Sequence, residues 1–198
     1  MEITLIPLFF YSISASITPG PNNIMLTASG ANFGFLKTIP HMFGILCGIV
    51  GLFALIAGGL NLIFEQIPVL QSILKIAGAG YLLFLAWKIA TAGKLNGEIE
   101  TDSKPFTFIQ AALFQFLNPK ALIMGVTAMS AFTSSGDDYL YSAMIVILVF
   151  AVVCLPSISV WVGFGVGIGR LLSNALRRRI FNWSMGLLTA ATVVLILQ

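Results

Sequence analysis

The chain has 198 residues, of which 58% are hydrophobic and only 9% are charged. A soluble domain of this length would carry about a quarter charged residues to cover its surface. The formal net charge is +3, but it comes from only ten Lys and Arg residues, and these do not form a nucleic-acid-binding face. We therefore expect a membrane protein that has no water-soluble domain, has the lipid bilayer around it and does not bind nucleic acid.

Six apolar segments are each long enough to cross a bilayer, which takes about 20 residues in a helix. They lie at about Ile3–Gly30, Thr38–Phe64, Pro68–Ile89, Phe106–Phe132, Leu140–Gly169 and Ile180–Leu197. A charged linker at about residues 92–105 separates the third segment from the fourth. The sequence thus predicts one all-α transmembrane domain over residues 1–198, built from two halves of three spans each, at about residues 1–91 and 106–198.

The distribution of positive charges predicts the orientation, because Lys and Arg gather in cytoplasmic connections. With six spans, the connections after the first, third and fifth spans share one side of the membrane. That side carries Lys37, Lys88, Lys94, Lys104, Arg170, Arg177, Arg178 and Arg179. The other side carries Glu2, Glu65, Asp137 and Asp138, and Lys75 is the one positive residue near it. We therefore predict that the basic side is cytoplasmic and that both termini lie outside.

Proline and polar residues interrupt the first span of each half. The first span contains Thr18-Pro19-Gly20-Pro21-Asn22-Asn23, and the fourth contains Asn118-Pro119-Lys120. Because proline has no N–H, we expect exposed carbonyls at Ala15, Ile17 and Gln115. We also expect Thr18 and Asn118 to cap half-helices that begin with Pro19 and Pro119.

The two breaks occupy corresponding places in halves that must cross the membrane in opposite senses. This is the pattern of an inverted repeat, and paired broken helices of this kind are typical of a transporter's substrate site. The predicted site comprises Thr18, Pro19, Gly20, Pro21, Asn22, Asn23, Asn118, Pro119 and Lys120. The alternative is that both breaks are ordinary proline kinks.

Lys120 is the charged residue of this predicted site. An ammonium in the middle of a span costs about 2.5–3.5 kcal/mol, and at the start of a half-helix it also faces the positive end of the helix dipole. We therefore predict that Lys120 binds an anionic group such as a carboxylate, while the exposed carbonyls bind an ammonium. The alternative is a lysine that snorkels to the nearer interface.

Two further features lie outside the breaks. His41 can change its charge near neutral pH and is a candidate proton relay, the alternative being an ordinary interfacial side chain. Small residues recur at Gly44, Gly48, Gly163, Gly165, Gly167 and Gly169. Such stripes favour close helix packing within the chain, and a homodimer interface is the alternative.

The sequence contains no metal-ligand cluster, nucleotide-binding loop or catalytic constellation. We therefore expect no enzyme activity, no metal and no cofactor. No acidic residue lies deep in a predicted span, which argues against a cationic substrate. A passive channel remains an alternative, although its helices should carry a continuous polar stripe, whereas here polar residues cluster at two points.

These motifs make the sequence resemble the LysE/RhtB family of amino-acid exporters, and the pattern is closest to its cysteine/O-acetylserine exporter branch. The matching segments are Thr18–Asn23, Gly30–Phe35, Lys37–Thr38, Pro40–Gly44, Gly78–Tyr81, Ala86–Lys88 and Asn118–Ala121. The resemblance implies export of a small amino acid or derivative across the bacterial cytoplasmic (inner) membrane, driven by the proton gradient. Other branches handle other amino acids, and the wider superfamily includes members assigned to metal-ion export.

Overall fold

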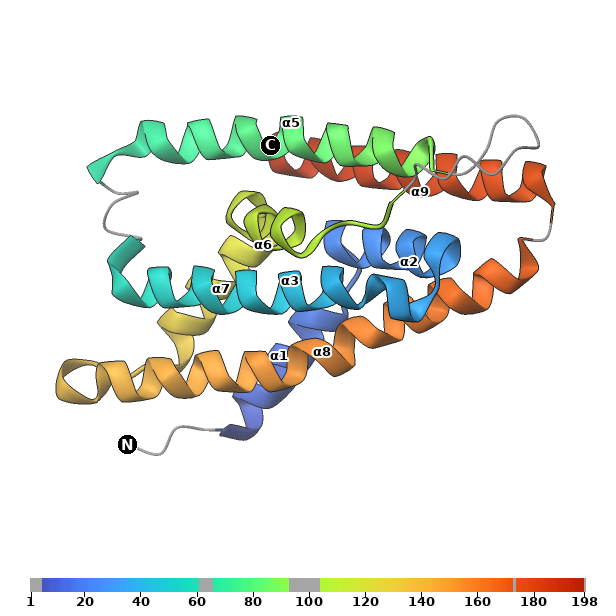
Figure 1. Cartoon of the computed structure of the whole chain (residues 1–198). Helices are drawn as coiled ribbons and strands as arrows, with labels where there is room; N and C mark the ends of the chain where they lie inside the picture. The colour runs from blue at the N-terminus through green and yellow to red at the C-terminus, as the bar shows by residue number, and fades with distance from the viewer. Residues whose placement is uncertain (1–4, 61–65, 93–103, 173, 198) are drawn as a thin grey trace.

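The computed structural model describes residues 5–60, 66–92, 104–172 and 174–197, and no residue in these ranges lies in a strand. The first half contains α1 (Leu5–Ile17), α2 (Pro21–Phe33), α3 (Phe35–Leu55), the π-helical turn η1 (Ile56–Leu60) and α5 (Pro68–Ala90). The second half contains α6 (Phe108–Leu117), α7 (Pro119–Phe132), the 3-10 turn η2 (Gly136–Asp138), α8 (Tyr139–Leu171) and α9 (Ala175–Leu197) (Figure 1). The all-α prediction is confirmed.

Three of the described helical segments are long and apolar enough to cross a membrane. They are Phe35–Leu60, Ser72–Ala90 and Gly136–Leu171. The helices α1, α6 and α7 are also apolar but have only 10 to 14 residues each. A helix of that length covers only part of the hydrocarbon layer, so α1 and α2, like α6 and α7, must be considered as consecutive pieces.

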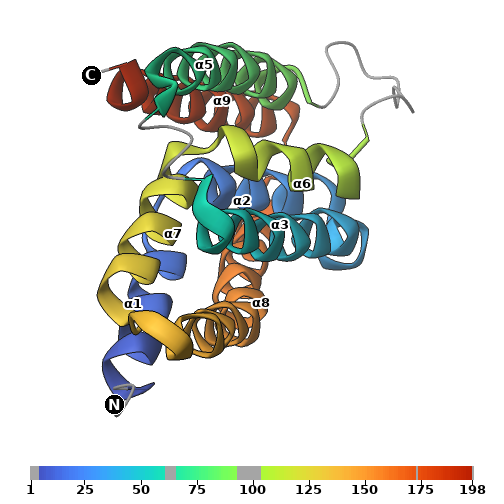
Figure 2. The same ribbon diagram turned by 90° about the vertical axis from the view of Figure 1, so that its left-hand side faces the viewer.

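The helix α2 lies at the centre of the molecule, and the other helices surround it. Most of its residues are buried although its sequence is not strongly apolar. The pair α5 and α9 packs side by side along one edge, and α8 crosses the opposite side (Figures 1 and 2). The larger apolar core lies between α3, α7 and α8, where the rings of Phe53 and Phe150 meet at 4.9 Å. A smaller core around Leu82 and Phe114 joins α5 to α2 and α6.

Glycines allow the central helices to approach until their backbones touch. A Cβ atom at Gly165 of α8 would lie 2.2 Å from the carbonyl oxygen of Thr27 in α2, and one at Gly44 of α3 would lie 2.3 Å from that of Phe108 in α6. Close approaches of the same kind occur at Gly48 and Gly169. The prediction of close packing within the chain is therefore confirmed at these four positions. A Cβ at Gly163 or Gly167 would meet no atom within 4 Å, and a homodimer interface there stays a prediction.

The connections are tighter than the sequence predicted. A predicted connection at Gly30–Thr38 is reduced to Gly34, because α2 continues to Phe33 and α3 begins at Phe35. Gly34 has φ 82°, a conformation that glycine adopts without the steric cost of a side chain. The last helix likewise begins at Ala175, so Arg177–Arg179 lie in its first turns instead of in a loop.

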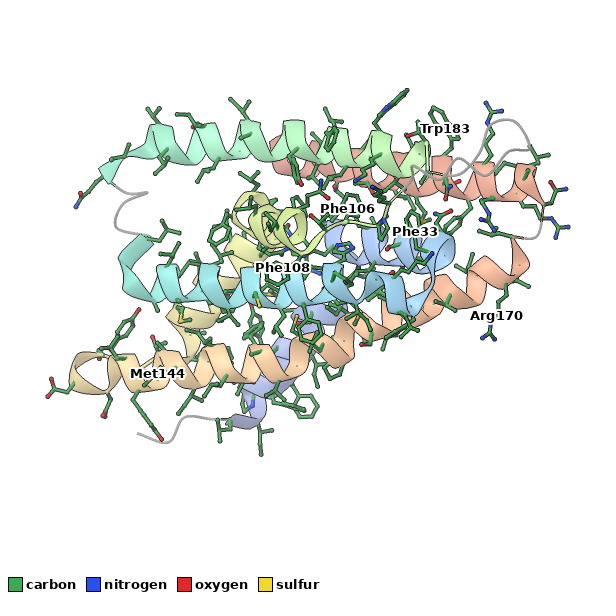
Figure 3. All side chains as sticks on the ribbon, in the orientation of Figure 1. Phe33, Phe106, Phe108, Met144, Arg170 and Trp183 are labelled. Carbon is green, nitrogen blue, oxygen red and sulfur yellow. The ribbon has the colours of Figure 1, made fainter. Side chains whose placement is uncertain are left out.

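Most basic residues of the described part lie at one end of the helices, and the acidic residues Asp137 and Asp138 lie at the other (Figure 1). The start of α3, the end of α5, the end of α8 and the start of α9 lie at one end, the right-hand side of Figure 1. Exposed Arg170 lies there as well (Figure 3), whereas η2 with Asp137 and Asp138 lies at the other end. Which end faces the cytoplasm stays a prediction. Most of the predicted linker, together with Glu2, Glu65 and Gln198, lies outside the described residues.

Candidate functional site

The chain leaves helical geometry at both predicted breaks. α1 ends at Ile17 and α2 begins at Pro21, while α6 ends at Leu117 and α7 begins at Pro119. Proline suits the first position of a helix, where its missing N–H would have no partner within the helix. Both breaks are therefore confirmed as features of the fold.

The second break has the geometry that the sequence predicted. Asn118 has an extended backbone, with φ −88° and ψ 108°, and its side-chain oxygen accepts a hydrogen bond from the backbone N–H of Lys120 at 3.1 Å. Asn118 is only 2% exposed. It therefore caps α7 from a buried position, and Pro119 is the first helical residue.

The first break differs from the prediction, because the half-helix starts at Pro21 and not at Pro19. A residue that precedes proline is disfavoured in helical geometry, and Gly20 accordingly adopts an extended backbone, with φ −175° and ψ 176°. Thr18 therefore does not cap α2. Its hydroxyl instead donates to the carbonyl of Ala15 at 3.1 Å, which makes Thr18 part of the end of α1.

The carbonyls that were expected to be exposed all accept hydrogen bonds. The carbonyl of Ile17 accepts from the indole N–H of Trp161 in α8 at 3.0 Å. That of Gln115 accepts from the backbone N–H of Asn118 at 3.3 Å, and that of Ala15 from the hydroxyl of Thr18. Buried backbone groups almost always find a partner; here side chains replace the helical donors at Ile17 and Ala15, and a backbone N–H replaces the donor at Gln115. These carbonyls are therefore not without a partner in this conformation, and their binding of an ammonium stays a prediction.

Lys120 joins the two breaks. Its ammonium donates to the carbonyl oxygen of Thr18 at 2.6 Å and to the hydroxyl oxygen of Thr18 at 2.9 Å. The side chain passes over Gly20, where a Cβ atom would lie 2.8 Å from Cδ of Lys120. Lys120 thus lies at the C-terminal end of α1, where a helix dipole favours a cation. The prediction from the sequence included only the unfavourable dipole of α7, the helix that carries Lys120.

Two amide side chains complete the connection between the breaks. Nδ2 of buried Asn23 donates to the carbonyls of Ser16 and Thr18, at 3.0 and 2.8 Å. Asn22 exchanges hydrogen bonds with the side chain of Gln115 in α6. This side-chain role of Gln115 was not predicted from the sequence. The missed signal was an amide side chain in an apolar span, three residues before the break.

A cavity lies between the two breaks, with contributions from α1, α2, α3, α7 and α8. The volume of the cavity is about 30 Å³. The lining residues are Ala15, Ser16, Gly20, Asn22, Asn23, Ile45, Ile49, Asn118, Lys120, Ala121, Met124, Cys154 and Ile158. Five of the predicted site residues therefore line it, whereas Thr18, Pro19, Pro21 and Pro119 form the breaks beside it.

The cavity has a polar side at the breaks and an apolar side opposite. Asn22, Asn23, Asn118 and Lys120 provide the polar groups, and α3, α7 and α8 provide the apolar wall. Among the described residues that line it, Lys120 is the only Lys, Arg, Asp or Glu. Ser16 adds a buried hydroxyl oxygen with no hydrogen-bond partner in the described part of the chain. The arrangement suits a small molecule that has an anionic group and an uncharged side chain.

The structure places His41 away from this cavity and not at an interface. Its side chain is fully buried, and its ring lies 5.2 Å from the ring of Phe106, which also lies under the ammonium of Lys88 at 4.9 Å. Neither ring nitrogen has a hydrogen-bond partner among the described residues. His41 is therefore a buried side chain, and both its position relative to the membrane interface and its relay role stay predictions.

Comparisons with known proteins agree with the resemblance in the motifs. The family described as LysE type translocator matches residues 13–197. Relatives from Escherichia coli O157:H7 and Escherichia coli K12, each named cysteine/O-acetylserine efflux protein, are 35% and 34% identical over 134 residues, 67% of each chain. No solved structure matches the chain. The chain belongs to the LysE type translocator family.

Proposed function

We propose that the protein is a secondary transporter that exports a small amino acid or derivative, and that the cavity between the two breaks is its substrate site. The observation that carries the proposal is the position of Lys120, a cation on the wall of a cavity to which both broken helices contribute. The relatives named cysteine/O-acetylserine efflux proteins support the same class of function. The transporter acts without chemical change to its substrate.

The two sides of the cavity favour an amino acid with an uncharged side chain. We expect Lys120 to bind the substrate carboxylate and the amide side chains at the breaks to lie near the substrate ammonium, since both line the cavity. The apolar wall, with Ile45, Ile49 and Cys154, faces the position of the substrate side chain. A cationic side chain would have no carboxylate partner among the described lining residues. Cysteine and O-acetylserine meet these requirements.

The proposed architecture is a single domain of six spans in two inverted halves. In this arrangement α1 with α2 forms the first span and α6 with α7 forms the fourth, within halves at about residues 1–91 and 106–198. Support comes from the breaks, which occur in corresponding places and meet at one cavity. A substrate would reach this cavity from each side of the membrane in turn, as alternating access requires.

Proton coupling would supply the energy for export. One proton that enters across a potential of about 150 mV releases about 3.5 kcal/mol, which supports a concentration ratio of about 300 for a neutral zwitterion. His41 is the proposed relay, and the pH dependence of export by His41→Gln tests it. Export by that variant with an unchanged pH profile would remove His41 from the mechanism and leave the carrier proposal in place.

Counterflow in proteoliposomes tests the transport function directly. Vesicles loaded with an unlabelled amino acid should take up labelled cysteine or O-acetylserine from outside. Lys120→Met should reduce this exchange about 10- to 100-fold, the value of one hydrogen bond to a charged group. Lys75→Met is the matched control, since Lys75 is also in a predicted span but does not line the cavity.

Two results would contradict the proposal. Absence of counterflow for every amino acid in a panel would exclude an amino-acid carrier. Uptake of unrelated solutes without any dependence on internal amino acid would instead indicate a channel.

A further inference from the structure

We propose that Thr18 is an internal competitor of the substrate: its two oxygens occupy the ammonium of Lys120 in this conformation and leave it when a substrate carboxylate binds. This inference rests on the proposed function. The sequence motif predicted that Thr18 binds the substrate, whereas in this proposal Thr18 competes with the substrate for Lys120. It also makes the contact between α1 and α7 dependent on substrate.

The geometry of the contact is that of a carboxylate on an ammonium. The carbonyl oxygen of Thr18 lies 2.6 Å from Nζ of Lys120, and the hydroxyl oxygen lies 2.9 Å from it. An ammonium has three N–H donors, so the two oxygens of Thr18 leave one donor for other groups. A carboxylate that uses both of its oxygens therefore needs a position that Thr18 now holds.

Thr18 can give up Lys120 without losing all of its hydrogen bonds. Its carbonyl also accepts from Nδ2 of Asn23 at 2.8 Å, and its hydroxyl also donates to the carbonyl of Ala15 at 3.1 Å. The side chain of Thr18 is exposed, so no packed core must open for it to move. The exchange of Thr18 for a substrate carboxylate therefore leaves no buried group of Thr18 without a partner.

Competition of this kind links substrate affinity to the position of α1. A ligand that binds better to one conformation shifts the population toward it. An internal contact that stabilises the other conformation weakens binding, because the apparent Kd is the intrinsic Kd divided by the fraction of molecules in which Lys120 is free of Thr18. Weakening the contact between Thr18 and Lys120 should therefore tighten substrate binding, whereas loss of a true substrate contact should weaken it.

The test measures binding of O-acetylserine to the purified full-length protein by isothermal titration calorimetry. Thr18→Val keeps the shape of the side chain and removes the hydroxyl oxygen. We expect it to bind O-acetylserine about fivefold more tightly. This is less than the effect of one full hydrogen bond to a charged group, because the carbonyl oxygen of Thr18 remains. Thr18→Ser keeps the oxygen and should match the wild type. Thr91→Val is the matched control, because the Thr91 hydroxyl also donates to a carbonyl of its own helix, that of Trp87 at 2.8 Å.

A second ligand separates competition from general loosening of the site. The carboxamide of O-acetylserine lacks the carboxylate, so Thr18→Val should leave its affinity unchanged. Thr18→Ala removes the same oxygen without a branched side chain and should behave like Thr18→Val. The result then does not depend on the correct folding of a single variant. Binding of O-acetylserine that is unchanged or weaker in both variants, with normal binding by wild type, overturns the competition. Absence of binding by wild type to any amino acid overturns the proposed function itself.

Discussion

The side-chain amides of Asn22 and Gln115 exchange two hydrogen bonds across the two broken helices. Nδ2 of Asn22 lies 2.8 Å from Oε1 of Gln115, and Nε2 of Gln115 lies 3.2 Å from Oδ1 of Asn22. Nε2 of Gln115 also donates to the carbonyl of Ala111 at 2.8 Å, and Gln115 has no exposed surface. Because this pair joins α2 to α6 beside the cavity, it fixes the distance between the breaks.

Gln115→Leu should lower the free energy of unfolding by about 1–3 kcal/mol, because it leaves the amide of Asn22 without its buried partner. Thermal unfolding in detergent measures the effect. The double variant with Asn22→Leu should lose less stability than the two single variants together, since neither amide is then unpaired. Additive losses would show that the two side chains do not interact.

Gly20→Ala should abolish most transport while the protein still folds. The new Cβ would lie 2.8 Å from Cδ and 3.3 Å from Nζ of Lys120, so the lysine must leave its present position. The extended backbone of Gly20 is open to any residue, so no backbone strain adds to this effect. Counterflow and thermal unfolding, measured side by side, check the prediction.

Gly80→Ala is the control for this substitution, because a Cβ at Gly80 in α5 meets no atom within 4 Å. It should transport like the wild type. Normal transport by Gly20→Ala would mean that Lys120 can work from another position, and the assignment of the site to the Lys120 contact would then fail.

Gly165→Ala should destabilise the protein, whereas Gly167→Ala should not. The first places a Cβ 2.2 Å from the carbonyl oxygen of Thr27, a backbone atom that cannot move alone, and the second meets no atom within 4 Å. Overpacking of this kind costs about 1–3 kcal/mol. Thermal unfolding distinguishes the two variants. If Gly167→Ala alone changes the mass of the purified particle, Gly167 belongs to an interface between two copies.

Reporter fusions at the ends of the helices should reveal the orientation. We expect the start of α9, at Arg177–Arg179, to lie in the cytoplasm, and η2, at Asp137–Asp138, to lie outside, because positive residues stay on the cytoplasmic side. The linker at about residues 92–105 should be cytoplasmic and the C-terminus outside. A cytoplasmic C-terminus would show that the number of spans is not six, and the inverted repeat would be wrong.

The breaks could be predicted because proline and an asparagine cap act locally. Pro119 and Asn118 determine the start of α7 through their own chemistry, and the sequence placed that start correctly. At the first break two prolines competed, and the effect of Pro21 on the preceding Gly20 moved the helix start by two residues. Boundaries of this kind depend on the nearest neighbours in the chain, so sequence reasoning comes close to them.

The partners of the site could not be predicted, because they come from distant parts of the chain. Trp161 reaches Ile17 over 144 residues, and Lys120 reaches Thr18 over 102. Asn32 and Asn182 exchange hydrogen bonds over 150 residues. The composition of a span shows that it carries a polar side chain. Only the packing of the helices decides which group becomes the hydrogen-bond partner of that side chain. This is why the carbonyls at the first break were expected to be free.

Gly34 limits how far α2 can move independently of α3, and both helices line the cavity. One residue joins α2 to α3, so α3 must follow a movement of α2 along its axis, whereas three residues, 18–20, join α1 to α2 and are held by the hydrogen bonds of Thr18 to Lys120 and Asn23. Two extra residues after Gly34 would add about 7 Å of reach, comparable with more than one turn of helix. The short link therefore couples α2 to α3, so that neither helix can shift along its axis without the other.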